Sequence, residues 1–270
     1  MDLLITGAAG LVGRAMRREL RPWFPRMRLL DVAPVSDPAP GDEVMQGSIA
    51  DLSVVSAAMR GVRGVLHLAG CTTEAPIEAQ VEGNVVGAWN VFEAARIAGV
   101  ERVVFASSHH VVGYYPRRRR IGTEVLLRPD SRYGLTKAFG EGAGALFADK
   151  HGLRVLCVRI GFAGDAPVDR RRLSIWVSWR DLAQLVRIGL EHPSLRYAVV
   201  YGASDNARGF FDNRVAFDLG YTPKDRAEDY AAAVLAATEP EPEDEVGTIV
   251  MGGHFANLDH QGDPRRVLEW

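Results

Sequence analysis

A tyrosine and a lysine four positions apart are the side chains of this 270-residue chain best suited to acid–base chemistry. Tyr133 and Lys137 are expected on one face of a helix, because residues at this spacing lie about one turn apart. The lysine charge should disfavour the neutral phenol and lower the pKa of Tyr133 from its usual value of about 10. A tyrosinate of this kind can take the proton of an alcohol while a bound cofactor takes the hydride. Because the spacing is common by chance, its meaning depends on the other motifs of the chain.

A glycine-rich turn near the N-terminus predicts the site for that cofactor. Gly7, Gly10 and Gly13 lie between a predicted strand at 2–6 and a predicted helix at 11–20. The first glycine allows a tight turn, the second lets the backbone approach a pyrophosphate, and the third lets helix and strand pack closely. Free N–H groups at the helix N-terminus would face the phosphates. The turn therefore favours a dinucleotide site over a purely structural role.

An acidic residue ends the next predicted strand, at 27–31. Asp31 follows the glycine turn by roughly 20 residues, where a carboxylate can bind the hydroxyl groups of a ribose. Neither Arg nor Lys directly follows it to bind a 2′-phosphate. We therefore expect NAD rather than NADP as the cofactor.

The predicted strand at 64–68 ends at the edge of the sheet where ligands bind in folds of this type. The small residues Ala69 and Gly70, after Leu68, would let the backbone lie against the cofactor. His67 is expected to be a packed core histidine rather than a catalyst.

Hydroxyl side chains follow the predicted strand at 102–106, at the same edge. A serine there can hydrogen-bond the substrate oxygen and the tyrosine. We favour Ser108 for this role over Ser107, and over the alternative that both are only turn residues. His109 and His110 come next, and at most one should face the pocket because adjacent residues point to different sides. A metal site is not expected, since no set of acids or cysteines accompanies them.

Apolar runs of strand length alternate with amphipathic helices along the chain. This pattern predicts a parallel sheet covered by helices on both faces. The strands are expected at 2–6, 27–31, 43–47, 64–68, 102–106 and 154–160, and the helices at 11–20, 52–60, 79–98 and 131–150. The fold class is thus α/β, a doubly wound Rossmann sheet. We expect residues 1–160 to form the NAD-binding core and residues 161–270 to form a small substrate-binding cap that does not fold independently.

Bulk composition narrows the classes of partner. The net charge of −2 gives no field that would collect nucleic acid or an anionic membrane. No apolar run has the length of a membrane span, and the N-terminus lacks the basic flank of a signal peptide. Cys71 and Cys157 are expected to be free thiols in a reducing compartment. A cytoplasmic protein with a small-molecule substrate is therefore expected, and homo-oligomer formation is left open.

Two charged segments stand out from the rest of the sequence. The acidic stretch at 239–245 is expected to be a solvated connector rather than a binding tail. The four arginines at 117–120 are expected to form a solvated basic loop, in preference to an anion site.

These motifs together resemble the extended short-chain dehydrogenase/reductase family. The resemblance covers nearly the whole chain. It is carried by the glycine turn, Asp31, His67-Leu68-Ala69-Gly70, Asn84-Val85-Val86-Gly87-Ala88-Trp89-Asn90, Ser107-Ser108, Tyr133-x-x-x-Lys137 and Arg159-Ile160-Gly161. The cofactor-binding residues expected from the motifs and the resemblance are Gly7, Gly10, Leu11, Val12, Gly13, Asp31, Leu68, Ala69, Gly70, Asn84, Tyr133 and Lys137.

Within that family the chain is most similar to the uronate dehydrogenase branch. The matching stretches are Phe105-Ala106-Ser107-Ser108, Gly113-Tyr114-Tyr115-Pro116, Leu173-Ser174 before Trp176, Tyr201-Gly202-Ala203-Ser204 and Gly252-Gly253 before Phe255. This resemblance implies an enzyme that oxidises the anomeric carbon of a hexuronate to a lactone with NAD. It implies Tyr133 as the base, Lys137 as its partner and Ser108 as a hydrogen-bonding catalytic residue. The expected substrate-binding residues are Thr72, Ser108, His109, His110, Tyr133, Phe162, Arg171 as the carboxylate clamp, and Phe255.

Three positions depart from the pattern of the branch. His109 stands where these enzymes have asparagine, Phe162 stands where they have a substrate-contacting serine, and Ser48 stands where an acid is usual near the adenine. The first two bear on the substrate, since Phe162 cannot donate a hydrogen bond. A hexose, a hexose 6-phosphate or a sulfonated hexose is therefore an alternative substrate. A sugar-nucleotide epimerase or dehydratase and a non-enzymatic NAD sensor are the alternative functions.

Overall fold

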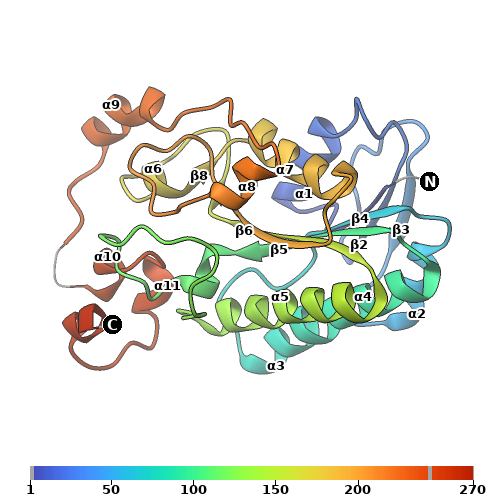
Figure 1. The fold of residues 1–270 in the computed structure, drawn as a ribbon, viewed down its shortest axis with the longest axis horizontal. Coiled ribbons are helices and arrows are strands. Elements are labelled where there is room, and N and C mark those ends of the chain that lie inside the picture. The colour runs from blue at the N-terminus through green and yellow to red at the C-terminus, as the bar shows by residue number, and fades with distance from the viewer. Residues whose placement is uncertain (1–2, 243–244, 270) are drawn as a thin grey trace.

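The computed structural model describes residues 3–242 and 245–269, and its centre is a parallel sheet (Figure 1). In the described part of the chain this sheet has seven strands in the order β3-β2-β1-β4-β5-β6-β9. Its strands are β1 (Leu3–Thr6), β2 (Met27–Asp31), β3 (Glu43–Gln46), β4 (Gly64–His67), β5 (Arg102–Ser108), β6 (Arg154–Ile160) and β9 (Tyr197–Gly202). Every pairing in it is parallel. The prediction of a doubly wound α/β fold is confirmed.

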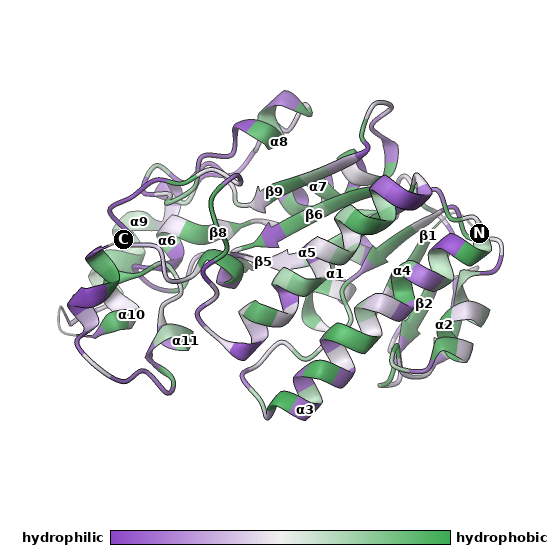
Figure 2. Ribbon diagram, turned by 60° about the horizontal axis from the view of Figure 1, so that its bottom comes forward, coloured by the Kyte–Doolittle hydropathy of each residue, from purple (hydrophilic) through white to green (hydrophobic). Residues whose placement is uncertain are grey.

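Helices cover both faces of the sheet (Figure 1). One face packs against α1 (Leu11–Glu19) and α7 (Trp179–Glu191), whose buried residues share an apolar cluster with the strands. The other face packs against α2 (Leu52–Met59), α4 (Gly87–Ala98) and α5 (Arg132–His151). Figure 2 shows hydrophobic residues along β6 and β9, which run between these layers. Burial on both faces explains why the strands read as continuous apolar runs.

Local signals set the ends of the helix that carries Tyr133. The Ser131 hydroxyl accepts a hydrogen bond from the Gly134 backbone N–H at 3.0 Å and so caps the N-terminus of α5. The helix ends at Gly152, which has a φ of 72°, in the left-handed region that favours glycine. The predicted helix at 131–150 is thus confirmed with bounds shifted by one residue.

The elements after β6 gather mainly beyond the end of the sheet toward which β5 points (Figure 1). They include a short parallel pair, β7 (Phe162–Ala163) with β8 (Trp176–Val177). The helical segments here are α6 (Arg172–Ile175), α8 (Arg214–Asp218), α9 (Glu228–Ala237), α10 (Val246–Ile249), α11 (His254–Asn257) and a 3-10 turn (Pro264–Glu269). Division of the chain at residue 160 remains a prediction, and β9 and α7 belong to the sheet layers although they follow it.

The sequence patterns located the six strands before residue 161 but missed α7 and β9. The predicted helix at 79–98 is divided into α3 (Ile77–Gln80), a π-helical segment (Val81–Val86) and α4. Both cysteines are free thiols, as expected. Among the described residues, no helix is long and apolar enough to cross a membrane.

The arginine run at 117–120 is not a uniformly solvated loop, so that expectation is wrong for Arg117. Its guanidinium donates to the carbonyls of Val250 (2.9 Å) and Gly247 (2.7 Å) and pairs with Glu241. These contacts tie the C-terminal segment to the core. Within the acidic stretch, Glu241 is thus an ion-pair partner, whereas Glu243 and Asp244 lie outside the described residues.

A buried ion pair fixes α5 on the sheet. Nε and Nη2 of Arg159 on β6 donate to the two carboxylate oxygens of Glu141 on α5, each at 2.9 Å. The Ser107 hydroxyl on β5 donates to the same carboxylate at 2.6 Å. Both charged residues are almost fully buried, with 2% and 4% of their surface exposed. One carboxylate therefore joins a helix and two strands through charge-assisted hydrogen bonds.

We predict that Glu141→Ala lowers the free energy of unfolding by about 3–5 kcal/mol, because it leaves the Arg159 charge buried without its partner. Urea denaturation followed by circular dichroism measures this loss. Glu93→Ala is the matched control, since it removes a partly exposed i,i+3 ion pair with Arg96 that should contribute about 0–1 kcal/mol. Equal losses in the two variants would show that the buried pair does not hold the helix.

Candidate active site

The carboxyl ends of the central strands and the start of α5 enclose a cavity of about 220 Å³. The expected catalytic residues Ser108, Tyr133 and Lys137 all line it. Its full lining is Val12, Leu68, Thr72, Ala106, Ser107, Ser108, His109, His110, Tyr133, Lys137, Ile160 and Gly161. Side chains from distant parts of the sequence are thus brought together as the motifs predicted.

The two serines at the end of β5 have different partners. Ser107 directs its hydroxyl to Glu141, where it helps to hold α5. Ser108 accepts a hydrogen bond from the His110 backbone N–H at 3.2 Å, and its hydroxyl also hydrogen-bonds the phenol of Tyr133. This arrangement favours Ser108 over Ser107 for contact with a substrate oxygen.

The expected fall in the pKa of Tyr133 is wrong for the chain by itself. Burial raises the pKa of this phenol to about 12, although the hydrogen bond with Ser108 acts in the opposite direction. Burial also lowers the pKa of Lys137 to about 8. The Lys137 Nζ lies 5.7 Å from the centroid of the Tyr133 ring and 5.1 Å from that of Phe105, so the ammonium rests over aromatic rings. Desolvation of the phenolate therefore outweighs the attraction of the lysine.

Both histidines after Ser108 line the cavity, which contradicts the expectation that at most one would face it. The reason is local: residues His109–Val112 form a 3-10 helix instead of continuing the strand. The ring centroids of His109 and His110 lie only 4.1 Å apart. Strand alternation, on which the expectation rested, ends at Ser108.

His109 is held between a carbonyl and an arginine. Its Nδ1 lies 3.1 Å from the Ile160 carbonyl oxygen, and its Nε2 lies 2.8 Å from Nη2 of Arg171. Because a guanidinium only donates, Nε2 must accept and Nδ1 must carry the proton. Burial lowers the pKa of His109 well below its usual value, and repulsion from His110 and Arg171 adds to this. His109 is therefore a neutral imidazole with a fixed tautomer.

Asp130 is a site residue that the sequence analysis missed. Its carboxylate lies 2.7 Å from Nδ1 of His110 and accepts a hydrogen bond from the Ser131 hydroxyl at 2.8 Å. Burial raises the pKa of Asp130 to about 6, while burial and the Arg171 charge lower the pKa of His110 to about 3. At neutral pH an ionised Asp130 thus holds a neutral His110 by its Nδ1–H, which leaves Nε2 as an acceptor. An acid directly before the helix cap was the available signal.

Backbone and aromatic groups enclose this pair. A Cβ at Gly113 or at Gly252 would lie 1.8 Å from the Asp130 carboxylate, so both positions require glycine. Phe255 stacks on His110 at a centroid distance of 4.4 Å and meets the edge of Tyr133 at 6.0 Å. The structure therefore brings Phe255 to the site, as the resemblance implied.

Arg171 and Phe162, which were both expected to bind the substrate, do not line the cavity. Arg171 donates from Nη2 to the carbonyls of Met251 and Gly252, both at 2.8 Å, besides its contact with His109. Burial, together with repulsion from other arginines, lowers its pKa to about 10, so it stays charged. Phe162 lies on β7, and the guanidinium carbon of Arg172 lies 4.8 Å from the centroid of the Phe162 ring. Phe162 does not line the cavity. Thr72, in contrast, lines the cavity.

The glycine turn forms a cradle of exposed backbone that fits a dinucleotide. Gly7 has a φ of 74°, and a Cβ there would lie 2.6 Å from the Ala69 nitrogen. A Cβ at Gly13 would lie 2.2 Å from the Gly7 carbonyl oxygen, so both positions exclude other residues. The Asp31 carboxylate stands beside the turn and accepts a hydrogen bond from the Ala9 N–H at 2.9 Å. Close backbone approach and an acid at the end of β2 are the features that a pyrophosphate and a ribose need.

The other residues expected at the cofactor site have different surroundings. Leu11 is 62% exposed at the start of α1, next to Gly10, whereas Val12 and Leu68 line the cavity. Asn84 binds the backbone of Cys71, which follows Gly70, through both its amide oxygen (2.8 Å) and its amide nitrogen (2.9 Å). It therefore shapes the loop after β4.

His67 is a core residue, as expected. Its Nδ1 is hydrogen-bonded to the Thr6 hydroxyl at 2.7 Å, and burial lowers its pKa to about 3.

Comparison with known proteins agrees with this arrangement. Residues 3–162 match the model of the NAD dependent epimerase/dehydratase family. A uronate dehydrogenase from Pseudomonas putida is 40% identical over 94% of this chain and 95% of its own length. A crystal structure of a mutant uronate dehydrogenase from Agrobacterium tumefaciens, complexed with NAD, superimposes with a TM-score of 0.91 at 40% identity, covering 94% of this chain and 96% of that one. An NAD-dependent glucose-6-phosphate dehydrogenase from Haloferax volcanii is 36% identical over 84% of this chain and 95% of its own length.

We predict that His110 stays neutral between about pH 5.5 and 8, because burial and Arg171 disfavour the imidazolium, and that its proton is fixed on Nδ1 only above the Asp130 pKa of about 6, where that carboxyl is ionised. Nitrogen-15 NMR of the histidine rings, assigned with the variant His110→Gln, measures the tautomer directly. In Asp130→Asn the amide can present either its oxygen or its NH₂ group, so the tautomer should no longer be fixed. Appearance of an imidazolium near pH 6.5 in the wild type would contradict the assignment.

Proposed function

The chain belongs to the NAD dependent epimerase/dehydratase family, and we propose that it is an NAD-dependent uronate 1-dehydrogenase. The observation that carries the proposal is the single cavity shared by Ser108, Tyr133 and Lys137 beside the glycine cradle. The likeness to uronate dehydrogenases over nearly the full length supports the same function. The reaction would oxidise the anomeric carbon of a hexuronate, with loss of one proton and one hydride, to give a lactone.

Residues of this chain would remove the proton of the C1 hydroxyl. Tyr133 would take the proton of the C1 hydroxyl, and Ser108 would hydrogen-bond the same oxygen as the carbonyl forms. Lys137, whose pKa of about 8 leaves it charged at neutral pH, would stabilise the phenolate. The cradle around Gly7 and Asp31 would hold NAD, which supplies the hydride acceptor when bound.

The remaining polar residues would position the sugar. Nε2 of His110, with its tautomer fixed by Asp130, can accept a hydrogen bond from a sugar hydroxyl. Arg171 would serve the C6 carboxylate through its Nη1, which makes no hydrogen bond to the described residues. Phe255, stacked on His110, would close the side of the pocket.

A hexose 6-phosphate is the second candidate substrate. The observation that favours it is the pair of departures at His109 and Phe162, together with the similarity to a glucose-6-phosphate dehydrogenase. A dehydratase would need an acid beside the catalytic hydroxyl, and Asp130 is already engaged by His110 and Ser131. An NAD sensor would have no need of the intact serine, tyrosine and lysine. Cytoplasmic location and homo-oligomer formation remain predictions.

Tyr133→Phe should reduce turnover of glucuronate and galacturonate on the order of 10²-fold or more, because it removes the general base. The appearance of NADH absorbance measures the rate, and calorimetry should find NAD binding unchanged. Tyr230→Phe is the matched control, because this tyrosine packs against Trp176, away from the cavity. A Tyr133→Phe enzyme that keeps most of the wild-type rate would place the base elsewhere.

The C6 anion is tested by Arg171→Ala, which should lower kcat/KM for a uronate roughly ten- to a hundredfold while affecting a neutral aldose much less. Arg170→Ala controls for loss of an adjacent arginine, since Arg170 binds the carbonyls of Leu235 and Thr238 instead. Equal losses of kcat/KM for neutral and anionic sugars would show that Arg171 only holds the backbone at 251–252 in place. Activity confined to hexose 6-phosphates would select the second candidate.

A further inference from the structure

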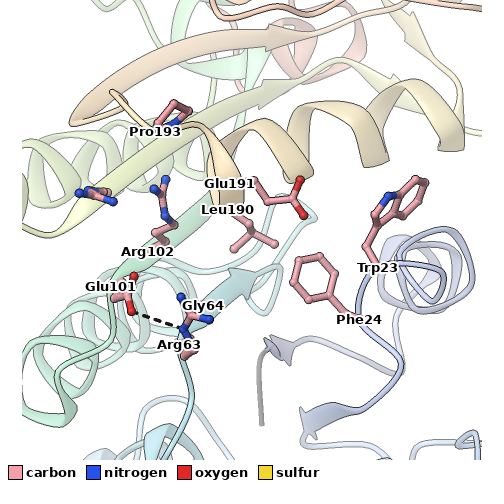
Figure 3. Close-up of a pocket in the computed structure, with 10 residues that line it drawn as sticks. Trp23, Phe24, Arg63, Gly64, Glu101, Arg102, Leu190, Glu191 and Pro193 are labelled. Carbon is pink, nitrogen blue, oxygen red and sulfur yellow. Dashed lines mark hydrogen bonds and ion pairs between the residues drawn. The ribbon is translucent and has the colours of Figure 1, made fainter.

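Figure 3 shows the residues that line a larger cavity, of about 740 Å³. It lies at the amino ends of the strands, whereas Tyr133 lines the cavity at their carboxyl ends. It forms where β4, β5 and β6 begin, between these strands, the end of α7 and the segment that follows α1. Nothing in the proposed reaction uses this edge.

Two arginines stand side by side in this cavity. Parallel pairing places Gly64 beside Arg102 and Arg102 beside Arg154, so the two arginines occupy matching positions on adjacent strands. Like charges at neighbouring positions of a sheet repel each other. Arg102 is moreover only 8% exposed. Such a pairing is unfavourable unless something of opposite charge lies between the two side chains.

The carboxylates of the cavity already have partners. Glu101 pairs with Arg63 at 3.4 Å, and Glu191 pairs with Arg187 at 2.8 Å. Within residues 3–242 and 245–269, neither Arg102 nor Arg154 makes an ion pair.

One contact fixes the Arg102 side chain at the cavity. Its Nη1 donates to the His192 carbonyl at 2.9 Å, whereas its Nε and Nη2 donate to no described residue. A charged side chain with little access to water and no ion-pair partner is costly to bury, and the attraction of Arg102 to Glu101 and Glu191 offsets this only in part. Burial first, and then repulsion from Arg154, lowers the pKa of Arg102.

The far wall of the cavity is apolar. Trp23 and Phe24 face it from the segment after α1, and Leu190 faces it from the end of α7 (Figure 3). Trp23 is 47% exposed, which is unusual for so large an aromatic side chain. The guanidinium carbon of Arg187 lies over its ring, 4.1 Å from the ring centroid. The cavity therefore joins a positive end to an aromatic surface.

We propose that this cavity binds a small organic anion, with its phosphate or carboxylate held by Arg102 and Arg154 and its apolar or aromatic body against Trp23 and Phe24. Guanidinium groups offer parallel N–H donors that match both kinds of anion. The volume lies within the roughly 300–1,000 Å³ of small-molecule sites. A bound anion would also give Arg102 a direct ion-pair partner, which no described residue provides. Since the sheet separates this cavity from the glycine cradle, the anion binds without competing with NAD.

The test uses the full chain saturated with NAD, so that the cradle is already filled. Phenyl phosphate and benzoate are the probes. The references are phenol, which has the aromatic ring but no anionic group, and inorganic phosphate, which has the anionic group but no ring. Calorimetry should detect binding of at least one probe, and each reference should bind more weakly than that probe. Arg154→Gln should weaken the probe by about tenfold or more, as loss of one charge-assisted contact predicts. Arg118→Gln, on an exposed loop, should leave the affinity unchanged.

Two results would overturn the proposal: no binding of either probe to the NAD-saturated wild type, or equal affinity in Arg154→Gln. Trp23→Ala provides an independent arm, because it leaves both arginines in place. It should weaken phenyl phosphate while leaving the much weaker affinity for inorganic phosphate unchanged. Equal binding of phosphate and phenyl phosphate would exclude the aromatic half of the site. Retained activity with NAD and a uronate shows that a variant is folded, so a failure here is distinct from a failure of the proposed reaction.

Discussion

The buried ion pair between Glu141 and Arg159 is the interaction on which the geometry of the site depends. Tyr133 and Lys137 lie on α5, whereas Ser108 lies at the end of β5, and nothing in either element alone fixes their separation. The bidentate pair, joined by Ser107, locks the helix against β5 and β6. Packing alone would allow the helix to slide by small amounts, but a bidentate contact accepts only one alignment. The register of the proposed catalytic groups is thus set largely by Glu141 and Arg159, which do not line the cavity.

Burial dominates the acid–base properties of the cavity. The same desolvation raises the pKa of Tyr133 and Asp130 and lowers the pKa of Lys137 and both cavity histidines. Tyr133 and both histidines are therefore neutral at pH 7, whereas Asp130, Lys137 and Arg171 keep their charges, so the direction of the hydrogen bonds between these two sets organises the free site. Asp130 and Arg171 then determine which imidazole nitrogens accept and which donate. A sugar presents hydroxyls that can do either, and a fixed pattern of donors and acceptors is what can distinguish one sugar from another.

The sequence predicted those features that follow from local chemistry. Glycine spacing, strand-length apolar runs and the Tyr133–Lys137 spacing report directly on backbone geometry, and the sheet, the cradle and the shared cavity followed from them. The roles of Asp130 and Arg171 did not, because each depends on partners 20 or more residues away, and the 3-10 helix at 109–112 did not because strand alternation was assumed to continue past Ser108. Strand β9 and helix α7 were missed because the motifs drew attention to the first 160 residues, although their apolar patterns are of the same kind. The prediction of a lowered pKa for Tyr133 was wrong for a related reason, because the spacing of Tyr133 and Lys137 does not show how deeply the phenol is buried.

Arginine has three distinct uses in this chain, and composition alone cannot separate them. Arg159 binds a carboxylate, and Arg117 and Arg171 bind mainly backbone carbonyls of the segment at 247–252. Arg102 and Arg154 lie side by side on adjacent strands, and neither forms an ion pair with the described residues. The second use has a consequence for the substrate. Gly253 has a φ of 66°, and a Cβ there would lie 2.4 Å from Nε of Arg171, so the backbone closes tightly on this guanidinium. The segment that places Phe255 on His110 is therefore the same segment that holds Arg171, and any shift in it alters both ends of the pocket together. The proposed substrate contacts and the attachment of the C-terminal segment therefore depend on the same stretch of backbone.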